Sequence, residues 1–380
     1  MNIVELVEDL NTIVRKDINR FIDLVLGKPK PDITFMTKSD GYMYFVPTNY
    51  NALFSVDLST GKCDLKCVFG NEKLYENFSG NAFCHNGYVI ICPFNFCKIH
   101  IWNIEEAREE KLKITERKSE EPAYLPRVIV ANESVLFFPS LSKDLYSLDI
   151  DTWKVEKILD IYKCFLSFNG NGYTVFSRDS GYIYKNKIYF SMSDAHYVAE
   201  YDILRNEIMF YELDLEDQII LSDGVENSLY MLSDAGIIYE WNINDHKLDK
   251  KTKVTYSNFN LLRIQSTARS NDSLYYMAPN DKFGIEYNIR LNSARIGNYS
   301  ELFKFQHTDS CEYHFALQDS DKKLYFISNA YELLIFDLGS KRYSNINLHF
   351  DDEQLRMLYF LQTAHEQKDS NIGRTIYQTI

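Results

Sequence analysis

One short pattern recurs seven times along this chain of 380 residues and limits what it can fold into. In each copy an apolar residue is followed by Asp or Asn and then by Ile or Leu. The copies are Val56-Asp57-Leu58, Trp102-Asn103-Ile104, Leu148-Asp149-Ile150, Tyr201-Asp202-Ile203, Trp241-Asn242-Ile243, Tyr287-Asn288-Ile289 and Phe336-Asp337-Leu338. The Asp or Asn residues are 46, 46, 53, 40, 46 and 49 residues apart. This spacing indicates one structural unit copied seven times.

The residues around each triplet predict that the unit is made of four antiparallel strands. A run of alternating bulky residues, such as Leu274-Tyr275-Tyr276-Met277, precedes the triplet, and a tight turn precedes that run. Asp40-Gly41 and Asn86-Gly87 suit primed turns, because both central residues of such a turn need positive φ. A proline ends the run in three consecutive copies, at Pro47, Pro93 and Pro139, as expected at a strand end because proline cannot donate to a sheet.

We therefore predict an all-β chain that forms a seven-bladed β-propeller of four-stranded antiparallel blades. Residues 1–30 are expected to form an amphipathic helix with its linker, residues 31–363 the propeller, and residues 364–380 a polar tail. Apolar residues lie at helical spacing over residues 3–26, and this helix either packs on the propeller or docks a partner or a second copy. The segment 357–361 either pairs with the first blade or belongs to a helix that begins near Asp351.

Charge and cysteine content narrow the class of protein. The net charge is −13, which disfavours nucleic acid as a partner because binding phosphates requires basic surfaces. No apolar run is long enough to span a bilayer, and the first 26 residues lack the pattern of a secretory signal. The seven cysteines include no CxxC pair. We expect a cytoplasmic protein with reduced cysteines.

Some repeats resemble those of known propellers. The segments 54–62 and 145–153, and to a lesser degree 334–338, are similar to the third strand and turn of kelch-type and PQQ-type repeats. The double glycine of kelch repeats and the Gly-His start of WD40 repeats are missing. The resemblance implies the propeller superfold, which hosts many unrelated functions.

The connections between the second and third strands, and those between blades, are expected to be longer than the others and to share one face. Loop aromatics and a histidine on that face are candidates for binding, because rigid rings bury large areas at small entropic cost. With two arginines expected on innermost strands, the predicted binding residues are Tyr50, Phe94, Phe96, His196, Tyr197, Phe283, Tyr331, Arg127 and Arg263. The alternative is that these rings fold inward and fill the loops.

Candidate chemical sites are weak. The cluster His307, Asp309, Cys311 and His314 matches no familiar zinc spacing, and residues 177–184 resemble a single Asp-box of sialidase propellers, a structural turn. We predict no catalytic residue, metal or cofactor. The predicted function is a non-catalytic binding scaffold for a protein or peptide on the long-loop face. The alternative is a carbohydrate-active or small-ligand propeller that uses Arg127 and Arg263 at the central mouth.

Overall fold

The computed structural model describes residues 31–33, 36–69, 82–91, 98–113, 127–131, 134–138, 144–169, 181–192, 196–255, 260–278, 281–305, 313–319, 322–356 and 358. For residues 98, 109–113, 127–131, 134–138, 144 and 169 it describes the backbone alone. The predicted helix over residues 3–26 and the polar tail over 364–380 lie outside the described residues.

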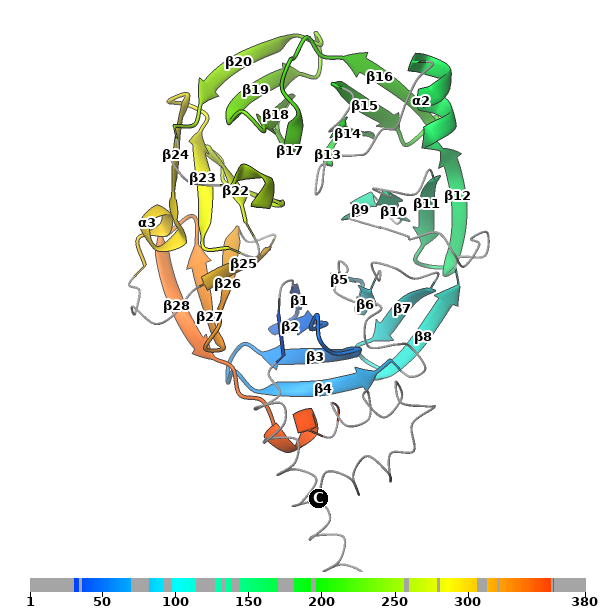
Figure 1. Cartoon of the computed structure of the whole chain (residues 1–380). Coiled ribbons are helices and arrows are strands. Elements are labelled where there is room, and N and C mark those ends of the chain that lie inside the picture. The colour runs from blue at the N-terminus through cyan, green and yellow to red at the C-terminus, as the bar shows by residue number, and fades with distance from the viewer. Residues whose placement is uncertain are drawn as a thin grey trace, which may run out of the picture.

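Seven four-stranded antiparallel sheets stand in a ring about a central axis, which confirms the seven-bladed propeller (Figure 1). Each sheet is one continuous stretch of chain, with its first strand nearest the axis and its fourth at the rim. Blade 1 holds β1 (Thr37–Ser39), β2 (Tyr42–Phe45), β3 (Ala52–Asp57) and β4 (Cys63–Val68). Blade 2 holds β5 (Ala82–His85), β6 (Tyr88–Ile91), β7 (Lys98–Asn103) and β8 (Arg108–Lys113). Blade 3 holds β9 (Arg127–Ala131), β10 (Ser134–Phe138), β11 (Asp144–Asp149) and β12 (Lys154–Asp160).

The other four blades follow the same order. Blade 4 holds β13 (Tyr182–Tyr184), β14 (Lys187–Met192), β15 (Tyr197–Asp202) and β16 (Glu207–Glu212). Blade 5 holds β17 (Ile219–Val225), β18 (Ser228–Ser233), β19 (Ile237–Asn242) and β20 (Leu248–Lys253). Blade 6 holds β21 (Ser266–Arg269), β22 (Ser273–Met277), β23 (Phe283–Asn288) and β24 (Ser293–Asn298), and blade 7 holds β25 (Tyr313–Gln318), β26 (Lys323–Ser328), β27 (Glu332–Asp337) and β28 (Arg342–Asn347).

The repeated Asp or Asn is the last residue of the third strand in every blade, and its side chain explains why it recurs. The Oδ1 atom of Asp57 accepts a hydrogen bond from the Ser59 amide at 2.7 Å, and that of Asn242 accepts one from the Asn244 amide at 2.9 Å. The other five residues accept amides two or three positions further on. The amides of the turn have no backbone partner in the sheet, and the side-chain oxygen of the Asp or Asn accepts their hydrogen bonds instead.

The flanking residues of the triplet also have defined roles. The residue before the Asp or Asn is buried in all seven copies: Val56, Trp102, Leu148, Tyr201, Trp241, Tyr287 and Phe336. The amide of the residue after it donates to the turn between the first two strands, as Leu58 does to the Gly41 carbonyl at 3.0 Å and Ile243 to Asn227 at 2.8 Å. The triplet thus packs the third strand and joins the two tight turns of the blade.

A second feature of this turn is hidden in the sequence. The residue four positions after each Asp or Asn has positive φ, although its identity varies: Gly61, Ala107, Trp153, Asn206, His246, Asn292 and Lys341. Six of the seven are not glycine, so each carries the steric cost of the left-handed conformation, about 1–2 kcal/mol.

We expect Lys341→Gly to raise the free energy of unfolding by about 0.5–1 kcal/mol, because glycine relieves the strain at φ 58° at a smaller cost in chain entropy. The matched control is Ser340→Gly in the same turn, where φ is not positive, so only the entropic cost remains and stability should fall. Urea titration measures both. Equal effects of the two changes would contradict this account of the turn.

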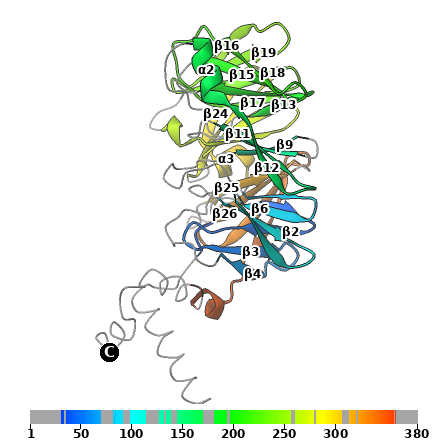
Figure 2. The same cartoon turned by 90° about the vertical axis from the view of Figure 1, so that its right-hand side faces the viewer.

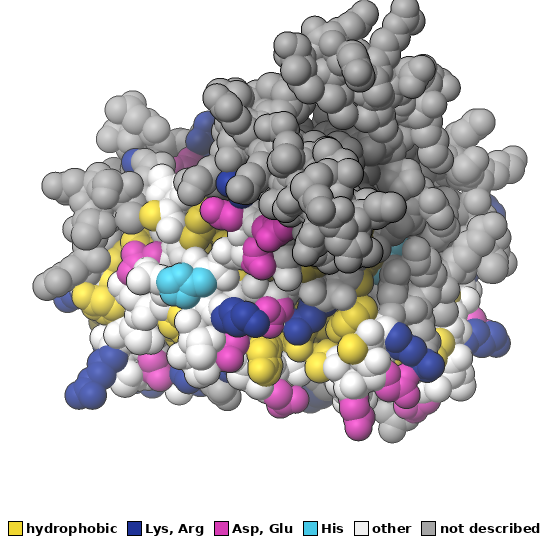
Figure 3. All heavy atoms as spheres, turned by 90° about the horizontal axis from the view of Figure 1, so that it is seen from below, with side chains coloured by type: hydrophobic (Ala, Val, Ile, Leu, Met, Phe, Trp, Pro, Cys, Tyr) yellow, Lys and Arg dark blue, Asp and Glu magenta, His cyan; other side chains and the backbone are white. Residues whose placement is uncertain are grey.

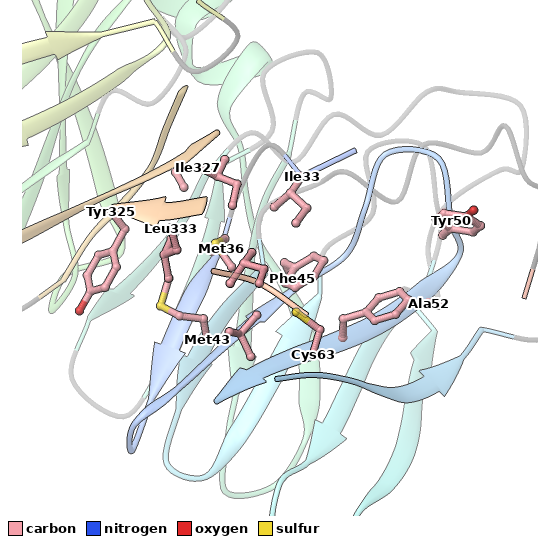
Figure 4. Packing of buried hydrophobic residues seen from close by; sticks show 14 of the residues in the cluster. Ile33, Met36, Met43, Phe45, Tyr50, Ala52, Cys63, Tyr325, Ile327 and Leu333 are labelled. Atoms are coloured by element: carbon pink, nitrogen blue, oxygen red, sulfur yellow. The ribbon is translucent and has the colours of Figure 1, made fainter. Parts of the chain in front are cut away.

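The core lies between the blades. Seven clusters of buried hydrophobic residues occur among the described residues, each built from facing surfaces of two neighbouring blades. Between blades 7 and 1, for example, Phe45 and Met43 pack with Tyr325, Ile327 and Leu333 (Figure 4). Each blade therefore hides both faces of its sheet only within the complete ring.

The ring closes without exchanging a strand between its first and last blades. Beyond β28 the chain runs beside the start of β4, where His349 forms a parallel bridge with Lys62 and its carbonyl accepts the Cys63 amide at 2.9 Å. Near the axis, Lys38 Nζ lies 2.8 Å from the Asp319 carboxylate. The closure thus adds polar contacts at the rim and near the axis to the hydrophobic cluster between blades 7 and 1.

Residues at the C-terminal end support this junction. Residues 352–356 and 358 are helical, with Asp351 accepting the Glu353 amide at 2.9 Å as a cap. Leu355 and Leu358 are buried in the cluster between blades 7 and 1. Of the two possibilities for this segment, the described part therefore follows the helix that begins near Asp351; Met357 and residues 359–361 lie outside the described residues.

One predicted strand is wrong. The sequence places Arg263 on an innermost strand, but Leu261–Arg263 is the 3-10 helix η1, and the innermost strand of blade 6 is β21 further along. Asn260 caps η1 by accepting the Leu262 amide at 3.1 Å, and Leu261 and Ile264 fill the cluster between blades 5 and 6. The apolar residues of this run serve a connection and not a sheet.

Candidate functional site

The two faces of the ring differ in how their connections are used. The turns between first and second strands and between third and fourth strands share one face, here called the tight-turn face. The connections between second and third strands and between blades share the other, the long-loop face, as antiparallel pairing requires. The second set includes η1 and two helices, α2 (Ile161–Asn169) and α3 (Tyr299–Phe303). Seen from the side, α2 and the helical turn at residues 352–356 lie toward the same face (Figure 2).

Three of the predicted binding aromatics are buried in the structure. Tyr50 belongs to the cluster between blades 7 and 1 (Figure 4), Tyr197 to that between blades 3 and 4, and Phe283 to that between blades 5 and 6. In the structure these rings have the inward orientation that the sequence left as the alternative.

Tyr331 and His196 are half-buried in the connections of the long-loop face, and both have positive φ. The Tyr331 hydroxyl donates to the Pro31 carbonyl at 3.0 Å, so this ring ties blade 7 to the chain entering blade 1. The His196 carbonyl accepts the Leu213 amide at 2.7 Å, which places the histidine beside the connection from blade 4 to blade 5.

The remaining predicted residues are dispersed. Phe94 and Phe96 lie outside the described residues. Arg127 begins the innermost strand β9, as expected, and its side chain is not described. Arg263 lies on η1, where its Nη1 atom pairs with Asp281 at 2.6 Å. The structure therefore brings His196 and Tyr197 together on blade 4 and Tyr50 and Tyr331 together at the junction of blades 7 and 1. A binding role for any of the nine stays a prediction.

A surface on blade 4 combines exposed apolar and acidic side chains. On α2, Ile161 and Phe165 are buried, whereas Leu166 and Phe168 are exposed, Phe168 to 53%. The Phe168 ring lies 5.6 Å from that of Tyr197 and 5.5 Å from that of Phe210. The helix thus packs by one side against blade 4 and leaves a large ring partly in solvent.

Several acidic side chains lie at the end of β16 and in the connection that follows it. The connection from blade 4 to blade 5 reads Glu212-Leu213-Asp214-Leu215-Glu216-Asp217, and it contacts the turn at Asp234 through the Gln218 carbonyl, which accepts the Asp234 amide at 2.9 Å. Glu212, Asp214, Glu216 and Asp234 are exposed, and none of the four pairs with a basic group of the described residues. Burial and the nearby charge of Glu212 both raise the pKa of Tyr197.

We call this surface the blade 4 rim. It consists of Leu166, Phe168, His196, Glu212, Asp214, Glu216 and Asp234. Of these seven residues, only His196 was predicted from the sequence to bind a partner. The acidic run at 212–217 could have been noticed in the sequence, and the spacing of Ile161 and Phe165 could have indicated a helix. Nothing in the sequence says that Phe168 stays exposed, because that depends on how α2 meets β16.

Among the described residues, no cluster of side chains is typical of a metal site or of a reactive thiol. Within the described ranges no group of three or more His, Cys, Asp or Glu side chains could hold a metal ion. His314 lies on β25, while His307, Asp309 and Cys311 lie outside the described residues. The four cysteines that the structure describes are free thiols, and burial raises the pKa of Cys63 and of Cys84 to about 12. In the part of the chain that is described, no helix is long and apolar enough to cross a membrane.

The side of the ring at blade 1 is mixed in charge. Lys and Arg side chains alternate with Asp and Glu there, with hydrophobic side chains between them (Figure 3). Lys62 and Asp64 of blade 1 form an exposed ion pair, 2.8 Å apart. Such exposed pairs contribute little to stability.

The fold and these surfaces define the chain as a seven-bladed β-propeller with four-stranded blades. No known protein family matches the sequence, and no curated protein sequence matches it. Solved structures do resemble it. Virginiamycin B lyase from Staphylococcus aureus has a TM-score of 0.57 at 11% identity, with 78% of this chain and 91% of that chain covered.

Two further structures are similar. KlAtg21, in a complex with the coiled coil of AgAtg16, has a TM-score of 0.54 at 9% identity, covering 80% of this chain and 94% of that chain. Kluyveromyces lactis Hsv2 has a TM-score of 0.50 at 6% identity, covering 84% of this chain and 100% of that chain. Likeness at such low identity establishes the shared propeller fold alone.

Proposed function

We propose that this propeller is a binding scaffold and that the blade 4 rim receives a protein partner. The observation that carries the proposal is the partly exposed ring of Phe168, packed against Tyr197 and Phe210 of blade 4, together with the acidic run after β16, where Glu212, Asp214 and Glu216 have no basic partner among the described residues. A partner segment with apolar and basic residues on one face would bury the ring and pair with the carboxylates. Such central aromatic anchors supply most of the affinity of protein interfaces, and complementary charge speeds association.

The use of the two faces supports this proposal. On the tight-turn face, all seven turns after the third strands are occupied by the same internal hydrogen bonds. The connections that hold helices, η1, α2 and α3, lie on the long-loop face, and connections that vary over a rigid scaffold are where binding sites usually lie. A structurally similar ring, KlAtg21, is found in a complex with a coiled coil. We further propose that the repeats are similar to kelch-type and PQQ-type repeats and that the protein is cytoplasmic.

The test begins with capture of a partner from the native host by the full chain, followed by titration of the identified partner. We expect Phe168→Ala and, separately, the double change Asp214→Lys with Glu216→Lys each to weaken the affinity at least about tenfold. Wild-type affinity should fall steeply as salt rises, because the contacts of exposed carboxylates are screened.

The matched controls lie on the tight-turn face of the same blade. Leu204 is an exposed apolar side chain in the turn after β15, and Glu207 is exposed at the start of β16. Leu204→Ala and Glu207→Lys should leave the affinity unchanged. The blade 4 rim is rejected as the site if the rim variants and the controls lose the same affinity for the partner, or if the rim variants bind as well as the wild type.

A further inference from the structure

A second arginine lies where Arg263 was expected. Arg269 ends β21, the innermost strand of blade 6, at the tight-turn end of the ring's centre. Its backbone is held by the side-chain amide of Gln318 from blade 7, which accepts the Arg269 amide at 2.7 Å and donates to the Arg269 carbonyl at 2.6 Å. The amide side chain thereby continues the pairing of a sheet from one blade to the next, and the Arg269 backbone is fixed.

The side chain of Arg269 is also fixed, by blades 4 and 5. Its Nη1 atom donates to the Gly224 carbonyl at 2.7 Å and lies 3.4 Å from the Asp223 carboxylate, while the guanidinium lies 5.5 Å from the centre of the Tyr182 ring. The ring can lie there because residue 224 is glycine: a Cβ atom would come within 2.1 Å of it. The Tyr182 hydroxyl donates to the Glu226 carbonyl at 2.7 Å, which holds the ring in place.

These contacts use only one end of the guanidinium. A guanidinium carries five N–H donors, and every contact that Arg269 forms with an acceptor of the described residues goes through Nη1. The Nε and Nη2 atoms, which form the edge that matches a carboxylate or phosphate with two parallel hydrogen bonds, have no such acceptor. The side chain is nevertheless 48% exposed, so it remains in contact with solvent.

We propose that the Nε and Nη2 edge of Arg269 binds the oxyanion of a small ligand, a carboxylate or a phosphate group, at the tight-turn end of the innermost strands. The guanidinium is held before binding by groups from blades 4 and 5, and the Arg269 backbone by Gln318 of blade 7, which lowers the entropic cost of binding. Asp223 opposes the ligand, because its nearly buried carboxylate repels a second anion. The site is independent of the blade 4 rim, which lies on the other face.

The experiment is isothermal titration calorimetry of the full chain with inorganic phosphate and, in a second arm, with succinate. Saturable binding of at least one is expected, and the better ligand shows whether the site prefers a phosphate or a carboxylate. Arg269→Lys keeps the charge and removes the two-pronged edge, so affinity should fall at least about tenfold. Asp223→Asn removes the opposing charge and should raise affinity about threefold or more.

The gain expected for Asp223→Asn guards against misfolding, because a damaged protein does not bind more tightly. Arg290→Lys is the matched control: Arg290 lies on the same face in the turn after β23, is 76% exposed and pairs with Asp272 at 2.8 Å. The affinity of Arg290→Lys for phosphate or succinate should equal that of the wild type. The proposal is overturned if neither anion binds saturably to the wild type, if Arg269→Lys binds as well as the wild type, or if Asp223→Asn gains no affinity.

Discussion

Gly61→Ala is expected to lower the free energy of unfolding by about 3–5 kcal/mol, combining backbone strain with overpacking at one position. Gly61 has φ 74° in the turn after β3, so any side chain there is strained. A Cβ atom would also lie 1.9 Å from the Asn347 carbonyl oxygen of blade 7. Because a backbone atom cannot move aside as a side chain can, the chain beyond β28 would have to leave the edge of β4.

Gly41→Ala separates the two causes. Gly41 has φ 83° in the turn after β1, but a Cβ atom there meets nothing within 4 Å. Only the backbone strain remains, about 1–2 kcal/mol. Chemical unfolding of both variants measures the difference, and hydrogen exchange should show that Gly61→Ala loosens the amides of Cys63 and His349 first. Equal costs for the two glycines would show that the contact with blade 7 does not stabilise the ring.

Asp319→Asn is the second change with a large expected effect, a loss of about 2–4 kcal/mol at neutral pH. The Asp319 carboxylate is only 6% exposed and accepts hydrogen bonds from Lys38 at 2.8 Å, from the Tyr325 hydroxyl at 2.8 Å and from the Lys323 amide at 2.9 Å. An asparagine can still accept the Lys323 amide, but it turns donors or a neutral oxygen toward Lys38. The ammonium then loses the negative charge of Asp319 at the junction of blades 7 and 1.

The same pair gives this variant a pH signature. Burial works to raise the pKa of Asp319, but the hydrogen bonds from Lys38, the Lys323 amide and Tyr325 outweigh it and hold the pKa below its usual value. A lowered folded-state pKa means that the pair stabilises the protein above the unfolded pKa, about 4, and that this contribution is lost as pH falls through the folded pKa. The difference between wild type and Asp319→Asn should be largest above about pH 5 and shrink toward pH 3.

Asp249→Asn is the control for this prediction. Asp249 lies 3.1 Å from Lys247, and both side chains are more than half exposed, so the loss should stay below about 1 kcal/mol. Urea titrations of both variants from pH 3 to 7 measure the comparison. A cost for Asp319→Asn that matches the control, or that does not change with pH, would contradict a stabilising role for the ion pair.

The sequence could predict the blade because every blade repeats the same local solution. A turn that needs a short acceptor at Asp57 and at the six equivalent positions leaves a visible Asp or Asn, and turns such as Asp40-Gly41 leave glycine where both central residues have positive φ. In the turn between the third and fourth strands, the residue with positive φ could not be recognised from its type, because it varies from blade to blade. The strain at Ala107 or Lys341 is offset by the rest of the blade.

The candidate sites were harder to predict because they depend on contacts between blades. The apolar run at 261–264 has the composition of a strand, and only its packing between blades 5 and 6 shows that it fills a connection. For the same reason the sequence pointed to Arg263 and not to Arg269, whose partners come from residues 45 and 49 positions away. Loop aromatics such as Tyr50 looked available because burial of a loop ring is decided by its neighbours in space.

Each blade is one unbroken stretch of chain, and the described chain enters and leaves the ring at the junction of blades 7 and 1. Circular permutation therefore need not divide any sheet: linking the two ends at that junction and opening the chain between any other two blades keeps all seven units intact. Propellers that build one blade from both chain ends cannot be reordered in this way without splitting it. In this protein the gene could therefore begin with any blade while the order of the blades around the ring stays the same.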